Sequence, residues 1–193
     1  LTVTTLGDNR FEISFATQSE IGEYQLTIGP DITDLAGNAL TSQEIITLTV
    51  VPPPIHVGRY DFGSSGTRVA SDYTGVLASD LYNAARGYGW QSASLTGFDR
   101  FTTDLLLSDF HYGPSGTFLM DVQDGQYEVV ISMGDEGWFH DQMAVSLEGT
   151  QVDVITTQAG EYAVRSYLVD VSDGQLTLDL TDQGGANPTI VIN

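Results

Sequence analysis

The chain has 193 residues, enough for one large domain or two small ones, and with 41% hydrophobic residues it can bury a core and is not globally disordered. Its 26 acidic residues stand against 6 basic ones, all arginine, so the formal net charge is −20. This negative field excludes nucleic acid and anionic membranes as partners, because binding them needs a cationic footprint. It suits neutral or cationic ligands, divalent cations or a salty exterior, and most individual carboxylates are expected to be solvated surface charge.

The sequence contains no cysteine, which excludes disulfides and thiol chemistry. No run reaches the roughly 18 apolar residues of a membrane-spanning helix, so we expect no membrane insertion. The chain opens at Leu1 without a signal peptide, and we expect it to be a processed or excised piece of a longer protein.

The first part of the chain, residues 1–51, carries only strand signals. Residues 1–6 are rich in β-branched side chains, apolar residues alternate over 11–15 and 24–28, and residues 45–51 predict a final strand. That makes about four short strands, fewer than the roughly seven of a complete immunoglobulin-like sandwich.

A longer motif covers residues 22–40, which read GEYQLTIGPDITDLAGNAL. This segment resembles the C-terminal half of bacterial Ig-like repeats, with their pattern G-x-Y-x-L-x-I-G-P-x-I-x-D-x-A-G-N-x-L. The resemblance implies that residues 1–51 are a partial Ig-like β-sandwich that serves as a spacer. Its open edges are expected to be completed by further chain or by a neighbour, which would allow self-assembly.

Three consecutive prolines at 52–54 predict a stiff linker, because proline has a fixed φ and no backbone N–H to donate to a neighbouring strand. A second domain is expected over 55–193, with strands about every 8–12 residues and no helical period long enough for a βαβ unit. Within it we predict one helical turn over 80–85 and strands over 104–110 and 116–122, with a turn between these strands. The predicted fold is an all-β, antiparallel sandwich.

The second domain carries an ordered set of motifs: YDFG (60–63), GYGW (87–90), GTFLMDVQDGQYEVVISMGD (116–135), HDQMAVSLEG (140–149) and DGQLTLDLTDQGG (173–185). Together they resemble the galactose-binding-like β-sandwich that accompanies rhamnogalacturonan acetylesterases and β-agarases. The resemblance spans nearly all of 58–193 and implies a jelly-roll related to carbohydrate-binding modules, appended to a larger protein. It also implies further strand after Asn193, so we expect the chain to continue.

Residues 134–141 concentrate two adjacent aromatic residues, a histidine and three carboxylates between two predicted strands. Loops on rigid scaffolds often carry function. Sugar recognition needs flat aromatic faces that stack on the ring and polar groups that hold its hydroxyls. The candidates for stacking are Tyr88, Trp90, Trp138 and Phe139, and those for hydroxyl binding are Asp135, His140 and Asp141.

Several of these residues have a second interpretation. Trp90 is either a stacking platform or a core residue behind the glycine-flanked Tyr88. Trp138 lies in a polar loop, so we expect it to be exposed. His140 and Asp141 either bind the ligand or brace the loop through a structural hydrogen bond.

Catalytic patterns are missing from the sequence. There is no G-x-S-x-G elbow, and His56, His111 and His140 lie in separate segments without zinc-binding spacing. With 26 acids, chance carboxylate pairs are guaranteed and do not indicate a glycosidase. The esterase activity of the resembling proteins lies in a separate domain, so we predict that this chain is not an enzyme.

A structural Ca²⁺ is implied by the resemblance, because related sandwiches often hold this ion between an early strand and the last ones. Asp61 and Asp179 are the residues we nominate for it. No contiguous D-x-D-x-D-G loop is present, and Asp179 alternates with two leucines as an ordinary outward side chain does.

These observations predict a non-catalytic carbohydrate-binding module that targets a larger secreted or cell-surface bacterial protein to polysaccharide or oligosaccharide. The alternative is a structural domain of an extracellular adhesin or filament that assembles by strand donation. A third interpretation is an accessory domain that packs on a catalytic partner of the esterase or agarase type.

Overall fold

The computed structural model describes residues 1–7, 10–16, 18, 22–30, 32–33, 36–39, 41–50, 58–92 and 94–193. The chain divides into two compact units, Leu1–Pro53 and Pro54–Asn193. The predicted proline linker at 52–54 lies outside the described residues, as does His56. None of the helices found in the described part is long and apolar enough to cross a membrane.

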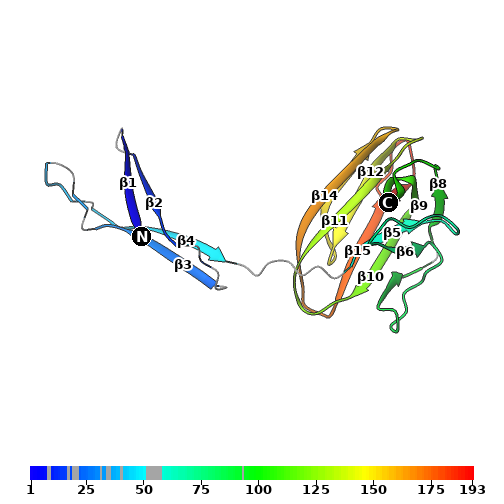
Figure 1. Cartoon of the computed structure of the whole chain (residues 1–193), viewed down its shortest axis with the longest axis horizontal. Coiled ribbons are helices and arrows are strands. Elements are labelled where there is room, and N and C mark those ends of the chain that lie inside the picture. The colour runs from blue at the N-terminus through cyan, green and yellow to red at the C-terminus, as the bar shows by residue number, and fades with distance from the viewer. Residues whose placement is uncertain are drawn as a thin grey trace. The chain divides into compact units, whose positions relative to one another are not determined.

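The first unit consists of two antiparallel strand pairs (Figure 1). Strand β1 (Thr2–Gly7) pairs with β2 (Arg10–Ser14), and β3 (Gly22–Ile28) pairs with β4 (Glu44–Val50). These are close to the four predicted strands. None of the residues of this unit whose burial is described is buried, and large apolar side chains such as Phe11 remain exposed. The Ig-like assignment itself stays a prediction.

One layer of the second unit is a five-stranded antiparallel sheet in the order β13-β12-β15-β10-β7; Figure 1 labels its strands β12, β15 and β10. Its central strand, β15, hydrogen-bonds to β10 on one side and to β12 on the other. The five strands are β7 (Tyr88–Trp90), β10 (Ser115–Asp121), β12 (His140–Leu147), β13 (Thr150–Thr157) and β15 (Gln175–Asp182).

The opposite layer contains three ladders: β11-β14, β16-β9-β8 and β5-β6. Asn193 N donates a hydrogen bond to Ser132 O at 3.0 Å, which joins the end of β16 to β11. The β5-β6 pair is parallel, which the sequence did not predict. Every other ladder described is antiparallel, in agreement with the predicted antiparallel sandwich. The strands are β5 (Tyr60–Gly63), β6 (Thr74–Leu77), β8 (Thr96–Asp99), β9 (Asp109–Gly113), β11 (Gly125–Asp135), β14 (Glu161–Val171) and β16 (Ile190–Ile192).

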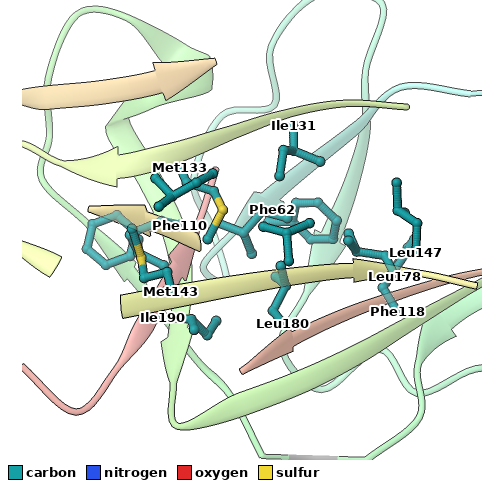
Figure 2. Close-up of a cluster of buried hydrophobic side chains, with 14 of the residues drawn as sticks. Phe62, Phe110, Phe118, Ile131, Met133, Met143, Leu147, Leu178, Leu180 and Ile190 are labelled. Carbon is teal, nitrogen blue, oxygen red and sulfur yellow. The ribbon is translucent and has the colours of Figure 1, made fainter. Parts of the chain in front are cut away.

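The core lies between these layers. In Figure 2 the side chains of Ile131 and Met133 from β11 and of Leu178 and Leu180 from β15 gather in one cluster. Because successive side chains of a strand point to opposite faces, the residues between them, such as Asp179, point away from it. The all-β sandwich predicted for this part of the chain is confirmed, and it forms a packed scaffold for the loops at its ends.

One predicted strand is wrong in its first half. Residues 105–108 form a single helical turn, α1 (Leu105–Ser108), because the carboxylate of Asp104 caps it. Its Oδ1 accepts hydrogen bonds from the backbone nitrogens of Leu106 and Leu107 at 3.1 and 3.4 Å. The following residues, 111–113, were predicted as a turn and instead belong to β9.

The predicted helical turn at 80–85 is also wrong. Leu81 and Asn83 instead make isolated bridges to strand β7. Gly89 in that strand has a φ of +144°, and a Cβ there would lie 2.6 Å from a backbone nitrogen of the facing segment, so the approach requires glycine. Close backbone packing therefore explains why the GYGW motif has a glycine at position 89.

Candidate functional site

The structure corrects the assignment of Trp90 as a stacking platform. Its side chain is 0% exposed, and its Nε1–H donates to His111 Nδ1 at 3.1 Å. The rings of Phe62 and Phe118 lie 5.3 and 5.2 Å from it, centroid to centroid. A fully enclosed ring cannot stack on a ligand, so Trp90 is the core residue of the second interpretation.

Tyr88 is half-buried at the edge of the five-stranded sheet. Its ring lies 4.9 Å from that of Tyr60 and 6.3 Å from that of Phe118, and the guanidinium of Arg86 lies 5.0 Å from its centroid. These neighbours come from β5, β10 and the preceding turn. The structure therefore does not bring Tyr88 to residues 134–141.

The predicted loop at 134–141 is shorter than expected, since β11 runs to Asp135 and β12 starts at His140. Trp138 in this connection is 61% exposed, which confirms the expected exposure, and Phe139 beside it is also exposed. Both rings are thus available to a ligand.

Asp135 and His140, at the two ends of this connection, are buried, which corrects their assignment as hydroxyl-binding residues. The Asp135 carboxylate accepts two hydrogen bonds from Arg100, Nε to Oδ1 and Nη2 to Oδ2, both at 2.7 Å, and a third from Gly137 N at 2.8 Å. Burial opposes ionisation of Asp135, but the hydrogen bonds from Arg100 and Gly137 and the Arg100 charge outweigh it, so its pKa lies below the ordinary value. His140 contacts Thr189 O through Nδ1 at 3.0 Å, and its Nε2 lies 3.6 Å from Asp135 Oδ2.

Asp141 is half-exposed and braces a second loop. Its carboxylate accepts hydrogen bonds from Ala186 N and Asn187 N, both at 2.9 Å, and these bonds hold its pKa below the ordinary value. The Asn187 side-chain amide in turn donates to Phe139 O at 2.5 Å. The bracing interpretation offered for His140 and Asp141 therefore describes both residues.

Sequence reasoning missed Phe101, which is 87% exposed and has a φ of +56°, a region that aromatic residues rarely occupy. Its backbone nitrogen donates to Asp99 Oδ1 at 2.6 Å, and the Ser108 hydroxyl donates to the same oxygen at 2.8 Å. The available signal was Arg100 beside it, one of only 6 basic residues in an acidic chain.

Arg100 joins the two exposed segments. Its guanidinium forms the ion pair with Asp135, lies 4.5 Å from the Phe98 ring centroid, and packs on Gly137, where an added Cβ would lie 2.9 Å from Arg100 Cζ. Phe101 directly follows Arg100, and Trp138 directly follows Gly137. We call the exposed rings of Phe101, Trp138 and Phe139 the aromatic surface.

Two acidic residues lie close in sequence to the rings of the aromatic surface, Glu136 before Trp138 and Asp104 after Phe101. Burial and then the charges of Glu136, Asp135 and Asp104 raise the pKa of Tyr162, whose hydroxyl donates to the Leu107 carbonyl at 3.1 Å. Glu136 and Asp104 are exposed. The site can thus offer apolar ring faces together with exposed hydrogen-bond acceptors.

The two acids nominated for calcium are not a pair. Asp179 accepts a hydrogen bond from Thr117 Oγ1 at 2.6 Å on the five-stranded sheet, whereas Asp61 is buried in β5 of the other layer, where the charge acting on it is that of Asp109. The nominated donor set of Asp61 and Asp179 therefore does not fit an ion. Within the described part of the chain no group of three or more His, Cys, Asp or Glu side chains could hold a metal.

The fold of the second unit is that of a galactose-binding-like β-sandwich. Residues 58–191 match the family described as beta-agarase/YXIM esterase-like, galactose-binding domain-like, and the chain belongs to this family. This confirms the resemblance found over 58–193. The match begins at residue 58, so it says nothing of the Ig-like prediction for residues 1–51.

Two curated relatives share this domain. An uncharacterized esterase, YxiM of Bacillus subtilis, is 32% identical over 136 residues, which are 65% of this chain and 32% of that protein. Beta-agarase A of Zobellia galactanivorans is 30% identical over 135 residues, 67% of this chain and 24% of that protein. The X-ray structure of YxiM has a TM-score of 0.54 at 29% identity and covers 69% of this chain and 37% of that chain. This chain thus spans a third or less of the length of these curated relatives.

Proposed function

We propose that the second unit is a non-catalytic carbohydrate-binding module and that a polysaccharide or oligosaccharide binds at the aromatic surface. The observation that carries this proposal is that the two most exposed Phe or Trp side chains described in the unit, Phe101 and Trp138, lie on segments joined by the partly buried Arg100–Asp135 pair. Exposed aromatic rings on ordered loops are a frequent feature of recognition surfaces.

The chemistry of the aromatic surface suits a sugar. Flat ring faces stack on the C–H face of a pyranose, and the exposed carboxylates of Glu136 and Asp104 can accept bonds from its hydroxyls. A neutral ligand also suits a chain of net charge −20, because it meets no electrostatic repulsion. The β-agarase among the relatives and the galactose-binding-like description of the family support a carbohydrate as the ligand.

The non-catalytic part of the proposal rests on how the polar groups near the aromatic surface are engaged. Asp135 is paired with Arg100, Asp141 is bonded to two backbone nitrogens, and His140 is buried against Thr189. Because Asp135 and His140 are buried, neither side chain is turned toward a bound sugar, and the Asp141 carboxylate is held by the backbone of another loop. The module would then target a larger secreted or cell-surface bacterial protein to polysaccharide, and the relatives do not favour the adhesin or filament alternative.

Binding of agarose-derived and other oligosaccharides to the full chain, measured by calorimetry, tests the proposal. Trp138→Ala and Phe101→Ala should each weaken binding about 5- to 30-fold, since a stacked ring contributes on the order of 1–2 kcal/mol. Phe11→Ala in the first unit is a matched control, because that ring is as exposed as Trp138, at 61%. Neither surface variant should change the melting temperature. Binding that survives in both variants would refute the assignment of this surface.

A further inference from the structure

A cavity of about 310 Å³ lies where strands β5 and β6 end and β8 begins. Small-molecule pockets range from about 300 to 1,000 Å³, so this cavity can hold one small ligand unit. Its walls carry hydroxyl groups and aliphatic side chains, from Ser64, Ser65, Ser79, Thr96, Leu77 and Leu95. None of the described residues that line it is charged, although the whole chain has a net charge of −20. The cavity therefore favours a neutral ligand that forms hydrogen bonds.

The backbone shapes this cavity. Gly97 lets β8 approach the loop that follows β5, because an added Cβ at Gly97 would lie 3.1 Å from both Gly63 O and Ser64 Cα. Strands β5, β6, β8 and β9 lie together on one side of the unit (Figure 1). Ser65 and Ser79 are exposed, so a ligand can reach their hydroxyl groups.

A row of side chains leads from the cavity toward the aromatic surface. Thr96, Phe98 and Arg100 share one face of β8, because successive side chains of a strand point to opposite faces. The ladder continues to Arg100, whose backbone N donates to Ser108 O at 2.7 Å. The Phe98 ring is 41% exposed, and the guanidinium of Arg100 lies 4.5 Å from its centroid. From Thr96 to Arg100 the extended chain spans about 13 Å. The cavity and Phe101 therefore lie at the two ends of one strand.

We propose that this cavity binds one sugar unit of the same glycan whose other units stack on the aromatic surface, with the exposed ring of Phe98 between them. This inference rests on the proposed function and narrows its ligand class. The ligand is then a neutral glycan of several units, because a monosaccharide or disaccharide cannot fill the cavity and reach the aromatic surface together.

The chemistry along β8 fits such a chain of sugars. Each unit of a glycan presents hydroxyl groups and C–H faces. The serine and threonine hydroxyls of the cavity can donate and accept hydrogen bonds, and the ring of Phe98 offers an apolar face. An uncharged cavity also avoids the desolvation cost that a buried carboxylate would add to sugar binding.

Calorimetric titration of the full chain with the agarose-derived disaccharide, tetrasaccharide and hexasaccharide tests the inference. Affinity should rise at least about 10-fold from the disaccharide to the hexasaccharide, because only the longer chain fills the cavity as well as the aromatic surface. A wild type that binds all three with equal affinity, or binds none of them, overturns the inference.

A double variant locates the additional sugar unit. Ser65→Leu combined with Ser79→Leu fills the cavity with apolar volume and removes two hydroxyl groups. It should weaken hexasaccharide binding at least about 10-fold and disaccharide binding less than about 2-fold. Ser71→Leu is the matched control, since Ser71 is an exposed serine of the same β5–β6 connection but is not among the residues that line the cavity. It should bind every oligosaccharide as the wild type does.

Amide NMR spectra of the isotope-labelled wild type give a second measurement, which holds even if the double variant fails to fold. The hexasaccharide should shift the amide signals of Ser65 and Gly97, and the disaccharide should not. Unshifted signals in the presence of bound hexasaccharide contradict the inference.

The two proposals fail in different ways. If the double variant binds the hexasaccharide as the wild type does while Trp138→Ala weakens binding, the cavity holds no sugar and the proposed function stands. If the double variant loses hexasaccharide binding while Trp138→Ala and Phe101→Ala keep it, the cavity binds the glycan and the aromatic surface does not, which overturns the joint site inferred here.

Discussion

The two units of the chain are built from similar strands but differ in what those strands bury. In β4 of the first unit Ile46 and Leu48 remain exposed, whereas in β15 of the second unit Leu178 and Leu180 are buried against the opposite layer. Both strands show the alternation that predicts a half-buried sheet. The difference teaches that alternation specifies a strand and its apolar face, while burial of that face requires a second layer.

Separating the units is the strongest way to break this comparison. Residues 55–193 should fold alone and melt cooperatively, whereas residues 1–51 should show no cooperative transition, because their strands leave an apolar face and open edges in water. Scanning calorimetry and circular dichroism of the two fragments measure this. A stable, monomeric 1–51 fragment would contradict the distinction.

A pair of leucine substitutions sharpens the comparison. Leu180→Ala, at a fully buried position of β15, should cost about 2–5 kcal/mol of unfolding free energy through lost burial and a cavity. Leu48→Ala, at an exposed position of β4, should cost less than about 0.5 kcal/mol. Chemical denaturation of the full chain followed by circular dichroism gives both values. Equal losses would show that Leu48 packs against something in solution.

Acid should weaken the second unit in particular, because residues 1–51 contain no histidine. Burial lowers the pKa of His111 to about 4, below the ordinary 6.5, so the folded state keeps the ring neutral. The stability contributed by this ring is fully present above pH 6.5 and is lost as the pH falls from 6.5 toward 4, by about 3 kcal/mol at most.

Unfolding free energies of the wild type and His111→Gln between pH 7 and 4 isolate this effect. Glutamine retains one donor and one acceptor for Gly63 O and Trp90 Nε1 but does not titrate. Its stability should therefore fall less on acidification. Protonation of Asp61 and Asp109 acts in the opposite direction in both proteins, because their raised pKa values favour the folded state at lower pH. Identical pH profiles would show that His111 is not the source of the loss.

The sequence predicted the sandwich because period-2 alternation and Asp-Gly turns are local signals, and it predicted the exposure of Trp138 from the polar loop around it. It could not decide between burial and exposure for Trp90, because the partners that enclose this ring, Phe62, Phe118 and His111, come from other segments of the chain. Asp135 was misjudged for the same reason, since its partner, Arg100, lies 35 residues before it. The exposed position of Phe101 depends on its positive φ, which no local sequence pattern predicts.

The Arg100–Asp135 pair has a consequence for how a glycan would bind. Because it clamps two loops in the folded protein, the rings of Phe101 and Trp138 are held on an ordered backbone before a ligand arrives. Little backbone freedom then remains to be lost on association, so the conformational entropy lost on binding comes mainly from ordering the sugar. Affinity should consequently grow with the number of sugar units that reach both rings, and dissociation rather than association should distinguish long glycans from short ones.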